Sequence, residues 1–257
     1  MISRKVIKAA IVTGASRGIG RAIAFRLAHD GFRVMLCARD QQLLDEAVGE
    51  IGEAAAAISL DLRLPESPRL LAQHALETFG RIDVVVNNAG ATKRGEFESL
   101  TDEEWADGFA LKFFGAVRLT RAAWPELKRQ AGSVVNISGV GGRTPGPQFT
   151  IGGSVNAALL SFTKALADLG VRDGVQVNAI NPGSVRTERL ERRLAADAAE
   201  KGIDLAAAAE NLVRSANITR IGETEDIAGL VSFIVSPGGR WLQGSLIDMD
   251  GGQTKTI

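Results

Sequence analysis

The chain has 257 residues, of which 45% are hydrophobic and 23% are charged, proportions typical of a folded globular protein. Lysine plus arginine and aspartate plus glutamate both number 30, so no bulk charge recruits nucleic acid or an anionic membrane. No apolar run reaches 18 residues, so we expect no transmembrane helix. The apolar run near the start is too short for a signal peptide and leads into a glycine loop, so we expect a cytoplasmic protein.

Cysteine and histidine are too few and too scattered for a metal site. The single Cys37 cannot form an internal disulfide, and together with His29 and His74 it makes no metal-ligand spacing. Because Cys37 lies in the apolar segment FRVMLCA, we predict that it is a small, buried hydrophobic side chain.

Short apolar runs alternate with helix-length segments along the chain. Ile19, Ile23 and Leu27, for example, form one apolar stripe at helical spacing. The predicted strands are residues 9–12, 33–37, 56–60, 83–87, 133–137, 175–180 and 245–249. Most are apolar without alternation, as expected of strands covered on both faces. We therefore predict one domain over residues 1–257, an α/β fold with a single doubly wound parallel sheet and helices on both faces.

A glycine loop follows the first predicted strand. In TGASRGIG, residues 13–20, three glycines (Gly14, Gly18 and Gly20) stand between a strand and a helix, where the missing Cβ permits a tight turn and close approach of a ligand. The helix N-terminus then offers free N–H groups and a positive dipole end to a pyrophosphate. This strand–turn–helix context predicts phosphate binding.

The end of the second predicted strand bears on the choice between NAD and NADP. NAD-selective sites place a carboxylate there for the ribose 2′-hydroxyl, but CARD puts Ala38 at this place, followed by Arg39. Arg17 stands in the glycine loop, and two guanidiniums suit a 2′-phosphate through bidentate, charge-assisted bonds. We favour NADP over NAD. The alternative is that both arginines are solvated surface residues and that Asp40 is the ribose partner.

Several motifs together resemble the short-chain dehydrogenase/reductase family. TGASRGIG is followed in order by DL (61–62), NNAG (87–90), a serine closing VVNIS (134–138), NPGSVRT (181–187) and DMDGG (248–252). The resemblance covers essentially the whole chain. It implies a Rossmann-like sheet, NAD(P) binding and, commonly, a homotetramer.

The resemblance also implies a path for the cofactor. Residues 61–62 would flank the adenine, residues 88–90 would line the adenosine and ribose path, and the NPGSVRT segment would hold the nicotinamide end. The implied cofactor-binding residues are Gly14, Ser16, Arg17, Gly18, Ile19, Gly20, Arg39, Asp61, Leu62, Asn88, Ala89, Gly90, Pro182, Gly183, Val185 and Thr187.

The family's catalytic group is Asn, Ser, Tyr and Lys, yet the chain contains no tyrosine at all. Aligning NAALLSFTKALA with the family's pattern puts Gly152 at the tyrosine position and Asn156 at the lysine position. A shift of one residue gives Ile151 and Val155 instead. Under either alignment both catalytic groups are missing.

Lys112, in the segment LKFFG (111–115), stands where the family has its asparagine. Relative to the family, lysine and asparagine are exchanged between positions 112 and 156. If the two helices pack side by side, as in the family, the exchange brings one ammonium and one amide into the same space. Lys112 would then reach the volume left by the tyrosine. There it could act as an acid with a lowered pKa, or it could stay charged and stabilise an oxyanion. The opposing interpretation is drift, with Lys112 pointing to solvent.

Ser138 is the retained member of the catalytic group. In the family its hydroxyl holds the substrate carbonyl, and the alternative is a hydroxyl that satisfies loop backbone groups. The candidate catalytic residues are therefore Ser138, Lys112 and Asn156.

Residues 186–215 form an amphipathic segment rich in Ala, Arg and Glu, where the family places a mobile substrate lid. A solvated helix pair is the plainer interpretation. The segment carries four arginines that hint at an anionic substrate, although interleaved acids weaken that hint: Arg186, Arg189, Arg192 and Arg193.

Taken together, these features predict an atypical short-chain oxidoreductase that transfers a hydride between NADP(H) and a carbonyl or alcohol substrate. One alternative is an NADP(H)-binding protein without redox activity, acting as a sensor or assembly partner. A more distant one is a lyase or isomerase that uses Lys112. The expected partners are a small-molecule substrate and further copies of the chain, but neither nucleic acid nor membrane.

Overall fold

The computed structural model describes residues 6–256, which form a parallel sheet of seven strands in the order β3-β2-β1-β4-β5-β6-β7. The strands are Ala9–Thr13 (β1), Arg33–Ala38 (β2), Ala55–Ser59 (β3), Val84–Asn87 (β4), Ser133–Ile137 (β5), Gln176–Pro182 (β6) and Leu246–Met249 (β7). The strand order reverses between β1 and β4, and open α/β sheets bind their ligands at such a point. The predicted fold class is confirmed, and the predicted strand ends differ by at most two residues.

The strands are apolar without alternation because both of their faces are buried. In β1, Ala10 and Val12 belong to one hydrophobic core, whereas Ala9 and Ile11 belong to the other. Cys37 of β2 lies in the second core, where burial raises the pKa of its thiol to about 12. The prediction of a small buried side chain at this position is confirmed.

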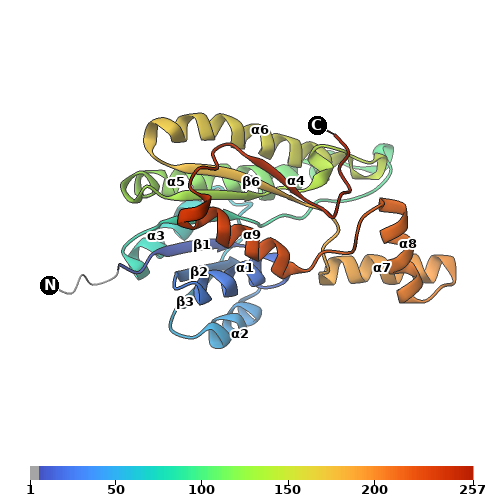
Figure 1. Ribbon diagram of the computed structural model, residues 1–257, viewed down its shortest axis with the longest axis horizontal. Helices are drawn as coiled ribbons and strands as arrows, with labels where there is room; N and C mark the ends of the chain where they lie inside the picture. Colours follow the sequence, from blue (N-terminus) through green and yellow to red (C-terminus); the bar gives the residue numbers. More distant parts are fainter. Residues whose placement is uncertain (1–5, 257) are drawn as a thin grey trace.

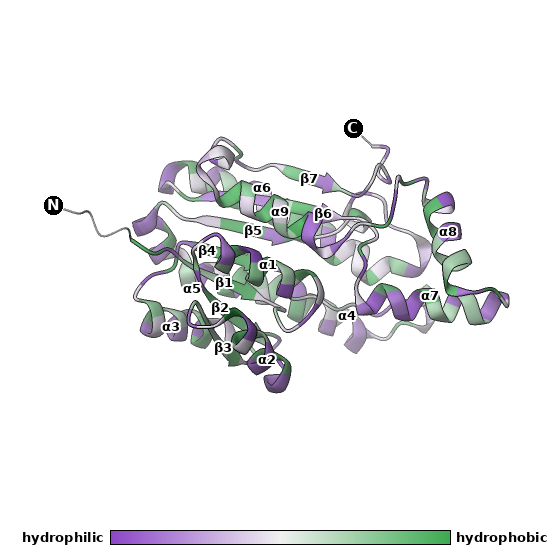
Figure 2. Cartoon of the chain, turned by 60° about the horizontal axis from the view of Figure 1, so that its bottom comes forward, coloured by the Kyte–Doolittle hydropathy of each residue, from purple (hydrophilic) through white to green (hydrophobic). Residues whose placement is uncertain are grey.

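Three helices cover each face of the sheet (Figure 1). One face carries α1 (Gly18–His29), α2 (Gln41–Ile51) and α9 (Thr224–Val235). The other carries α3 (Ser67–Phe79), α5 (Gly115–Gln130) and α6 (Thr150–Asp173). Figure 2 shows the expected distribution of hydropathy, with hydrophobic strands between helices whose outer sides are hydrophilic.

A π-helical segment interrupts the long helical run that crosses the second face. The run begins with α4 (Asp102–Gly108). Thr101 and Glu104 form a capping box at the N-terminus of this helix. It continues through the π-helical segment η2 (Phe109–Phe114) into α5. Such segments are rare and occur frequently at functional sites. Lys112 lies inside this one.

The helices α7 (Glu188–Lys201) and α8 (Leu205–Ala216) project at the carboxyl end of the sheet (Figure 1). The side chains of Thr187 and Asp204 cap them, and a small separate apolar cluster that includes Leu190, Leu194 and Ala208 holds them together. Four short 3₁₀ segments complete the described part: η1 (Phe97–Ser99), η3 (Val140–Gly142), η4 (Pro147–Phe149) and η5 (Pro237–Gly239). None of the helices in residues 6–256 is long and apolar enough to cross a membrane.

Candidate active site

The glycine loop between β1 and α1 is shaped for close approach of a ligand. Gly14 and Gly18 have φ values of 65° and 53°, which disfavour any other residue, and a Cβ on Gly20 would collide with the Gly14 carbonyl. No side chain caps the start of α1, and its first turn holds no acidic residue. The N–H groups of that turn are therefore available to an anion.

The NNAG segment is fastened to the glycine loop through Thr13. The Thr13 hydroxyl accepts hydrogen bonds from the backbone N–H groups of Asn88 and Ala89, at 2.9 and 3.0 Å. The Asn88 side chain in turn donates to the Thr13 carbonyl at 2.9 Å. Beyond the ends of β6 and β7, a Cβ on Gly183 would lie 2.8 Å from Cα of Asp250. The NPGSVRT segment therefore packs tightly against DMDGG.

The two arginines predicted to bind a 2′-phosphate differ in their surroundings. Arg17 forms an exposed ion pair of 3.1 Å with Glu188 at the start of α7, whereas Arg39 has no ion pair among residues 6–256. Asp61 is partly desolvated, but hydrogen bonds from Arg63 and the charge of Arg39 still hold its carboxyl pKa below the ordinary value. Asp40 caps α2 by accepting a 3.2 Å hydrogen bond from the Leu43 N–H.

The side chain of Lys112 points into the carboxyl end of the sheet, and its Nζ donates a 2.6 Å hydrogen bond to the Ser138 carbonyl. Its aliphatic stem passes Gly90 so closely that a Cβ at position 90 would lie 2.9 Å from its Cδ. Burial, and then the charge of Arg189, lower the pKa of the Lys112 ammonium from 10.5 to about 7.

Ser138 contacts this lysine through its backbone carbonyl, and Asn156 contacts Ser138. The Ser138 hydroxyl donates a 3.1 Å hydrogen bond to the backbone carbonyl of Asn156. The Asn156 side chain is buried, and its Oδ1 has no hydrogen-bond partner in the described part of the chain. Buried polar atoms rarely stay unpaired, so this oxygen is suited to accept from a ligand hydroxyl. The structure thus brings together Lys112, Ser138 and Asn156.

Phe149, rather than Lys112, occupies the space next to Gly152. A Cβ at position 152 would collide with the Phe149 ring, so the side chain nearest to Gly152 is that of Phe149. The guanidinium of Arg94 in turn stacks 3.9 Å from the Phe149 ring centroid. Sequence reasoning missed both residues, because neither an aromatic in a Gly/Pro-rich loop nor a lone arginine carries a distinguishing signal.

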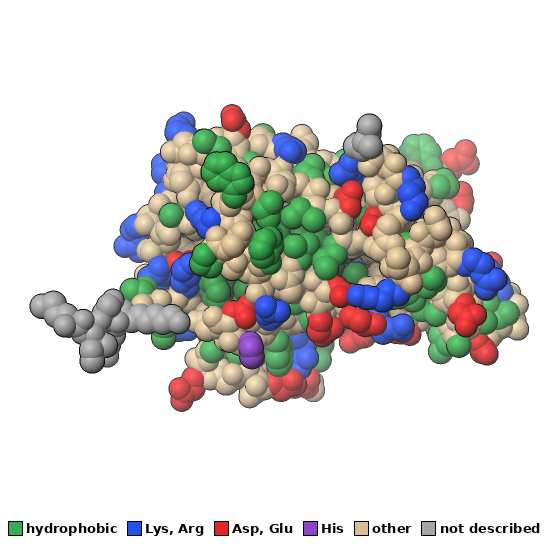
Figure 3. Space-filling view, viewed as in Figure 1, with side chains coloured by type: hydrophobic (Ala, Val, Ile, Leu, Met, Phe, Trp, Pro, Cys, Tyr) green, Lys and Arg blue, Asp and Glu red, His purple; other side chains and the backbone are tan. Residues whose placement is uncertain are grey.

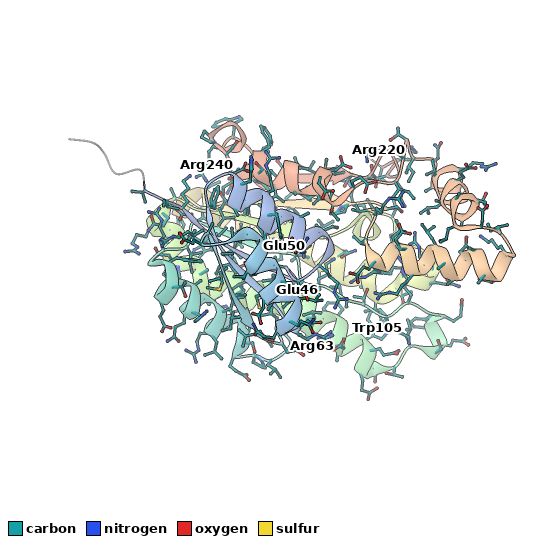
Figure 4. All side chains as sticks on the ribbon, turned by 90° about the horizontal axis from the view of Figure 1, so that it is seen from below. Glu46, Glu50, Arg63, Trp105, Arg220 and Arg240 are labelled. Atoms are coloured by element: carbon teal, nitrogen blue, oxygen red, sulfur yellow. The ribbon has the colours of Figure 1, made fainter. Side chains whose placement is uncertain are left out.

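The arginines of α7 point in different directions. Arg189 donates a 2.8 Å hydrogen bond to the Gly90 carbonyl and so ties α7 to the NNAG segment. Arg186 instead pairs with Glu191 and Glu223, at 2.8 and 3.3 Å. Figure 4 shows α7 at the same end of the molecule as Trp105, which is carried by α4. Within residues 6–256, no cluster of His, Cys, Asp and Glu is arranged to hold a metal ion.

Comparison with known proteins gives concordant matches. Residues 8–199 match the family model described as short chain dehydrogenase. An uncharacterized oxidoreductase of Mycobacterium tuberculosis (strain CDC 1551 / Oshkosh) is 37% identical over 252 residues, which are 96% of this chain and 92% of that protein.

Two solved structures are similar over nearly their whole length. L-Sorbose reductase from Gluconobacter frateurii, complexed with NADPH and L-sorbose, has a TM-score of 0.93 and 29% identity, with 98% of each chain covered. An NADPH-bound short chain oxidoreductase from Pseudomonas aeruginosa PAO1, described as containing an atypical catalytic center, has a TM-score of 0.88 and 29% identity. That match covers 97% of this chain and 98% of the other.

Proposed function

Because the chain belongs to the short-chain dehydrogenase family, we propose that it is an atypical NADP(H)-dependent oxidoreductase acting on a carbonyl or alcohol substrate. The observation that carries the proposal is the meeting of Lys112, Ser138 and Asn156 at the end of β5, in a chain without tyrosine. In this proposal Gly152 and Asn156 occupy the places of the family's Tyr and Lys. The NADPH complexes of two similar structures support the choice of cofactor.

The residues present fit a dinucleotide. The open N–H groups of the glycine loop suit its pyrophosphate, and the unpaired Oδ1 of Asn156 suits a ribose hydroxyl. Arg39 would bind the 2′-phosphate together with Arg17, which would exchange Glu188 for the phosphate. The remaining cofactor residues keep the places that the family resemblance implies. When bound, NADPH would supply the hydride.

Lys112 is assigned the role of proton donor to the substrate oxygen. A pKa of about 7 means that ammonium and amine are both populated near neutral pH, which suits a general acid. Ser138 would turn its hydroxyl from the Asn156 carbonyl to the substrate carbonyl, and the Asn156 amide would orient the ammonium. An acid of this kind typically contributes ~10²–10⁴-fold to the rate, in addition to roughly 7–11 kcal/mol available from positioning.

We assign the segment 186–215 the role of a substrate lid within the single domain. Helix α7 touches two of the cofactor loops, through the Arg17–Glu188 ion pair and the Arg189–Gly90 hydrogen bond. The Arg17–Glu188 ion pair is exposed, so it adds little to stability, and only one further hydrogen bond would have to open with it. A few exposed contacts at one end of a helix pair are what a lid requires.

Association of copies, most simply as a homotetramer, fits the apolar surface around α9 and β7. Trp241 is 98% exposed and Phe233 is 49% exposed, and Figure 3 shows further hydrophobic side chains gathered on this face. Large exposed apolar patches mark interaction surfaces. Light scattering after size-exclusion chromatography should give a mass above that of one chain, and Trp241→Ser with Phe233→Ser should reduce it.

The proposed activity is tested by single-turnover oxidation of NADPH, followed at its absorbance band. The panel contains a ketose, an oxo acid, an oxo ester and a diketone: L-sorbose, levulinate, methyl acetoacetate and phenanthrenequinone. Oxidation of NADPH with at least one compound, lost in Lys112→Met, supports the proposal. Tight NADPH binding without oxidation by any compound would favour a cofactor-binding protein without redox activity.

A further inference from the structure

Four cationic side chains around the mouth of the site are near enough to act electrostatically on one another: Lys112, Arg94, Arg189 and Arg193. Lys112 and Arg189 both contact Gly90, one through its aliphatic stem and the other through its guanidinium. Arg94 lies over Phe149, the residue that fills the space beside Gly152. Among residues 6–256, no carboxylate forms an ion pair with any of these four cations.

The acidic residues nearest in the sequence are engaged elsewhere. Glu188 pairs with Arg17, and Glu191 pairs with Arg186. Glu96, two residues from Arg94, accepts a 2.8 Å hydrogen bond from the Gln148 side chain, and Glu104 lies 3.7 Å from Lys93. None of these carboxylates forms an ion pair with Lys112, Arg94, Arg189 or Arg193 in the described part of the chain.

The cations act on one another across the mouth of the site. Burial, followed by the charges of Arg193 and Arg189, lowers the pKa of Arg94. Burial and the charge of Arg192 lower the pKa of Arg189 in the same way. The charge of Arg189 in turn lowers the pKa of Lys112. Like charges held together without a counterion disfavour the empty site, and an anion bound between them would relieve the repulsion.

We infer that Arg94 and Arg189 bind the carboxylate of the substrate, so that the compound reduced at Lys112 and Ser138 is an oxo acid. The Arg94 guanidinium lies over the Phe149 ring and donates no hydrogen bond within residues 6–256, so its N–H groups are available for a bidentate carboxylate. Arg189 uses one nitrogen for the Gly90 carbonyl and keeps its other donors. This inference rests on the proposed function of the same site.

The reaction balances with the reductant already proposed. The carbonyl carbon gains the hydride and forms a C–H bond, while the π pair of the C=O bond moves onto oxygen. That oxygen takes the proton of the Lys112 ammonium, and NADPH is oxidised to NADP⁺. The carboxylate itself is unchanged, so Arg94 and Arg189 contribute binding and orientation only.

The test is calorimetric titration of the complex with NADP⁺, a measurement that needs no turnover. The ligands are pyruvate, acetoacetate and levulinate, each compared with its methyl ester, because the three acids place the carboxylate at increasing distance from the carbonyl. At least one acid should bind roughly 10–100-fold more tightly than its ester, the strength expected of hydrogen bonds to charged groups. Arg94→Gln and Arg189→Gln should each remove most of this preference.

Arg214→Gln, at an exposed position on α8, is the matched control and should leave the preference intact. Equal binding of acids and esters, or a preference that survives both test substitutions, overturns the inference. A loss of NADP⁺ affinity in Arg94→Gln and Arg189→Gln, with no preference for acids, also overturns it and assigns the cations to the cofactor phosphates. Acids that bind but never oxidise NADPH would uphold carboxylate binding by Arg94 and Arg189 and refute the proposed reduction. If the esters are reduced as fast as the acids, the proposed function is supported and the inference of an oxo acid substrate is refuted.

Discussion

Replacing Lys112 with methionine should remove a rise in stability that the wild-type protein shows between about pH 7 and about pH 9. The pKa of this ammonium is 10.5 ordinarily but about 7 in the fold, where burial and Arg189 disfavour its charge. Between these two values the unfolded chain binds more protons than the folded chain. The free energy of unfolding therefore increases with pH across this range and is flat with respect to Lys112 below it.

The size of the effect follows from the same two values. Across the whole interval between the folded and the unfolded pKa of Lys112, the free energy of unfolding would rise by at most ~5 kcal/mol, because each pKa unit is worth about 1.36 kcal/mol. Two pH units lie within the range that is practical for unfolding experiments, so we expect a gain of about 2 kcal/mol in wild type relative to Lys112→Met. Methionine keeps the length of the stem that packs against Gly90 and loses the charge together with its hydrogen bond to Ser138.

Urea unfolding from about pH 6 to about pH 9, with linear extrapolation to water, measures this difference. Lys164→Met is the control, because Lys164 is exposed on α6 and forms no ion pair within the described residues. Its stability should follow the wild-type pH dependence. Parallel curves for wild type and Lys112→Met would refute the reasoning, since they would show that Lys112 titrates alike in the folded and unfolded chains.

Three further predictions concern the neighbours of Lys112 and the cofactor. Gly152→Tyr alone should lower the melting temperature by several degrees, because its Cβ would collide with the Phe149 ring, and adding Phe149→Ala should recover most of the loss. Asn156→Ala should weaken NADPH binding less in the Lys112→Met background than in wild type, and strict additivity in this double-mutant cycle would show that the two residues do not cooperate. Arg39→Ala should weaken NADPH binding by roughly 1.5–3 kcal/mol and hardly affect NADH, so equal losses for both cofactors would remove Arg39 from the 2′-phosphate site.

The architecture was predictable because its determinants are local in the sequence. A parallel strand buried on both faces must be apolar throughout, so runs such as that of β1 were recognisable without any partner strand. The tight turn of the first loop was predictable from its glycines in the same way, since a Cβ at position 20 would collide with the Gly14 carbonyl. Family motifs then ordered the remaining segments along the chain.

The candidate site was less predictable because its geometry depends on contacts between distant segments. Nothing in the sequence signals the π-helical segment that carries Lys112, and the hydrogen bond to Ser138 joins residues 26 positions apart. The place of Phe149 beside Gly152 depends on how the loop folds back on α6. Arg186 looked equivalent to Arg189 in the sequence, but Glu223 on the approach to α9 pairs with it.

The rate of hydride transfer as a function of pH tests the role of Lys112 most directly. It is measured in single turnovers of NADPH with whichever of the four panel compounds reacts fastest, in wild type, Lys112→Met and Lys164→Met. We predict that the wild-type rate falls as pH rises through about 7, where the ammonium is lost. Lys112→Met should be ~10²–10⁴-fold slower and should lack this dependence, while Lys164→Met matches wild type. A Lys112→Met protein with the wild-type rate and the wild-type pH profile would contradict the assignment of Lys112 as the proton donor.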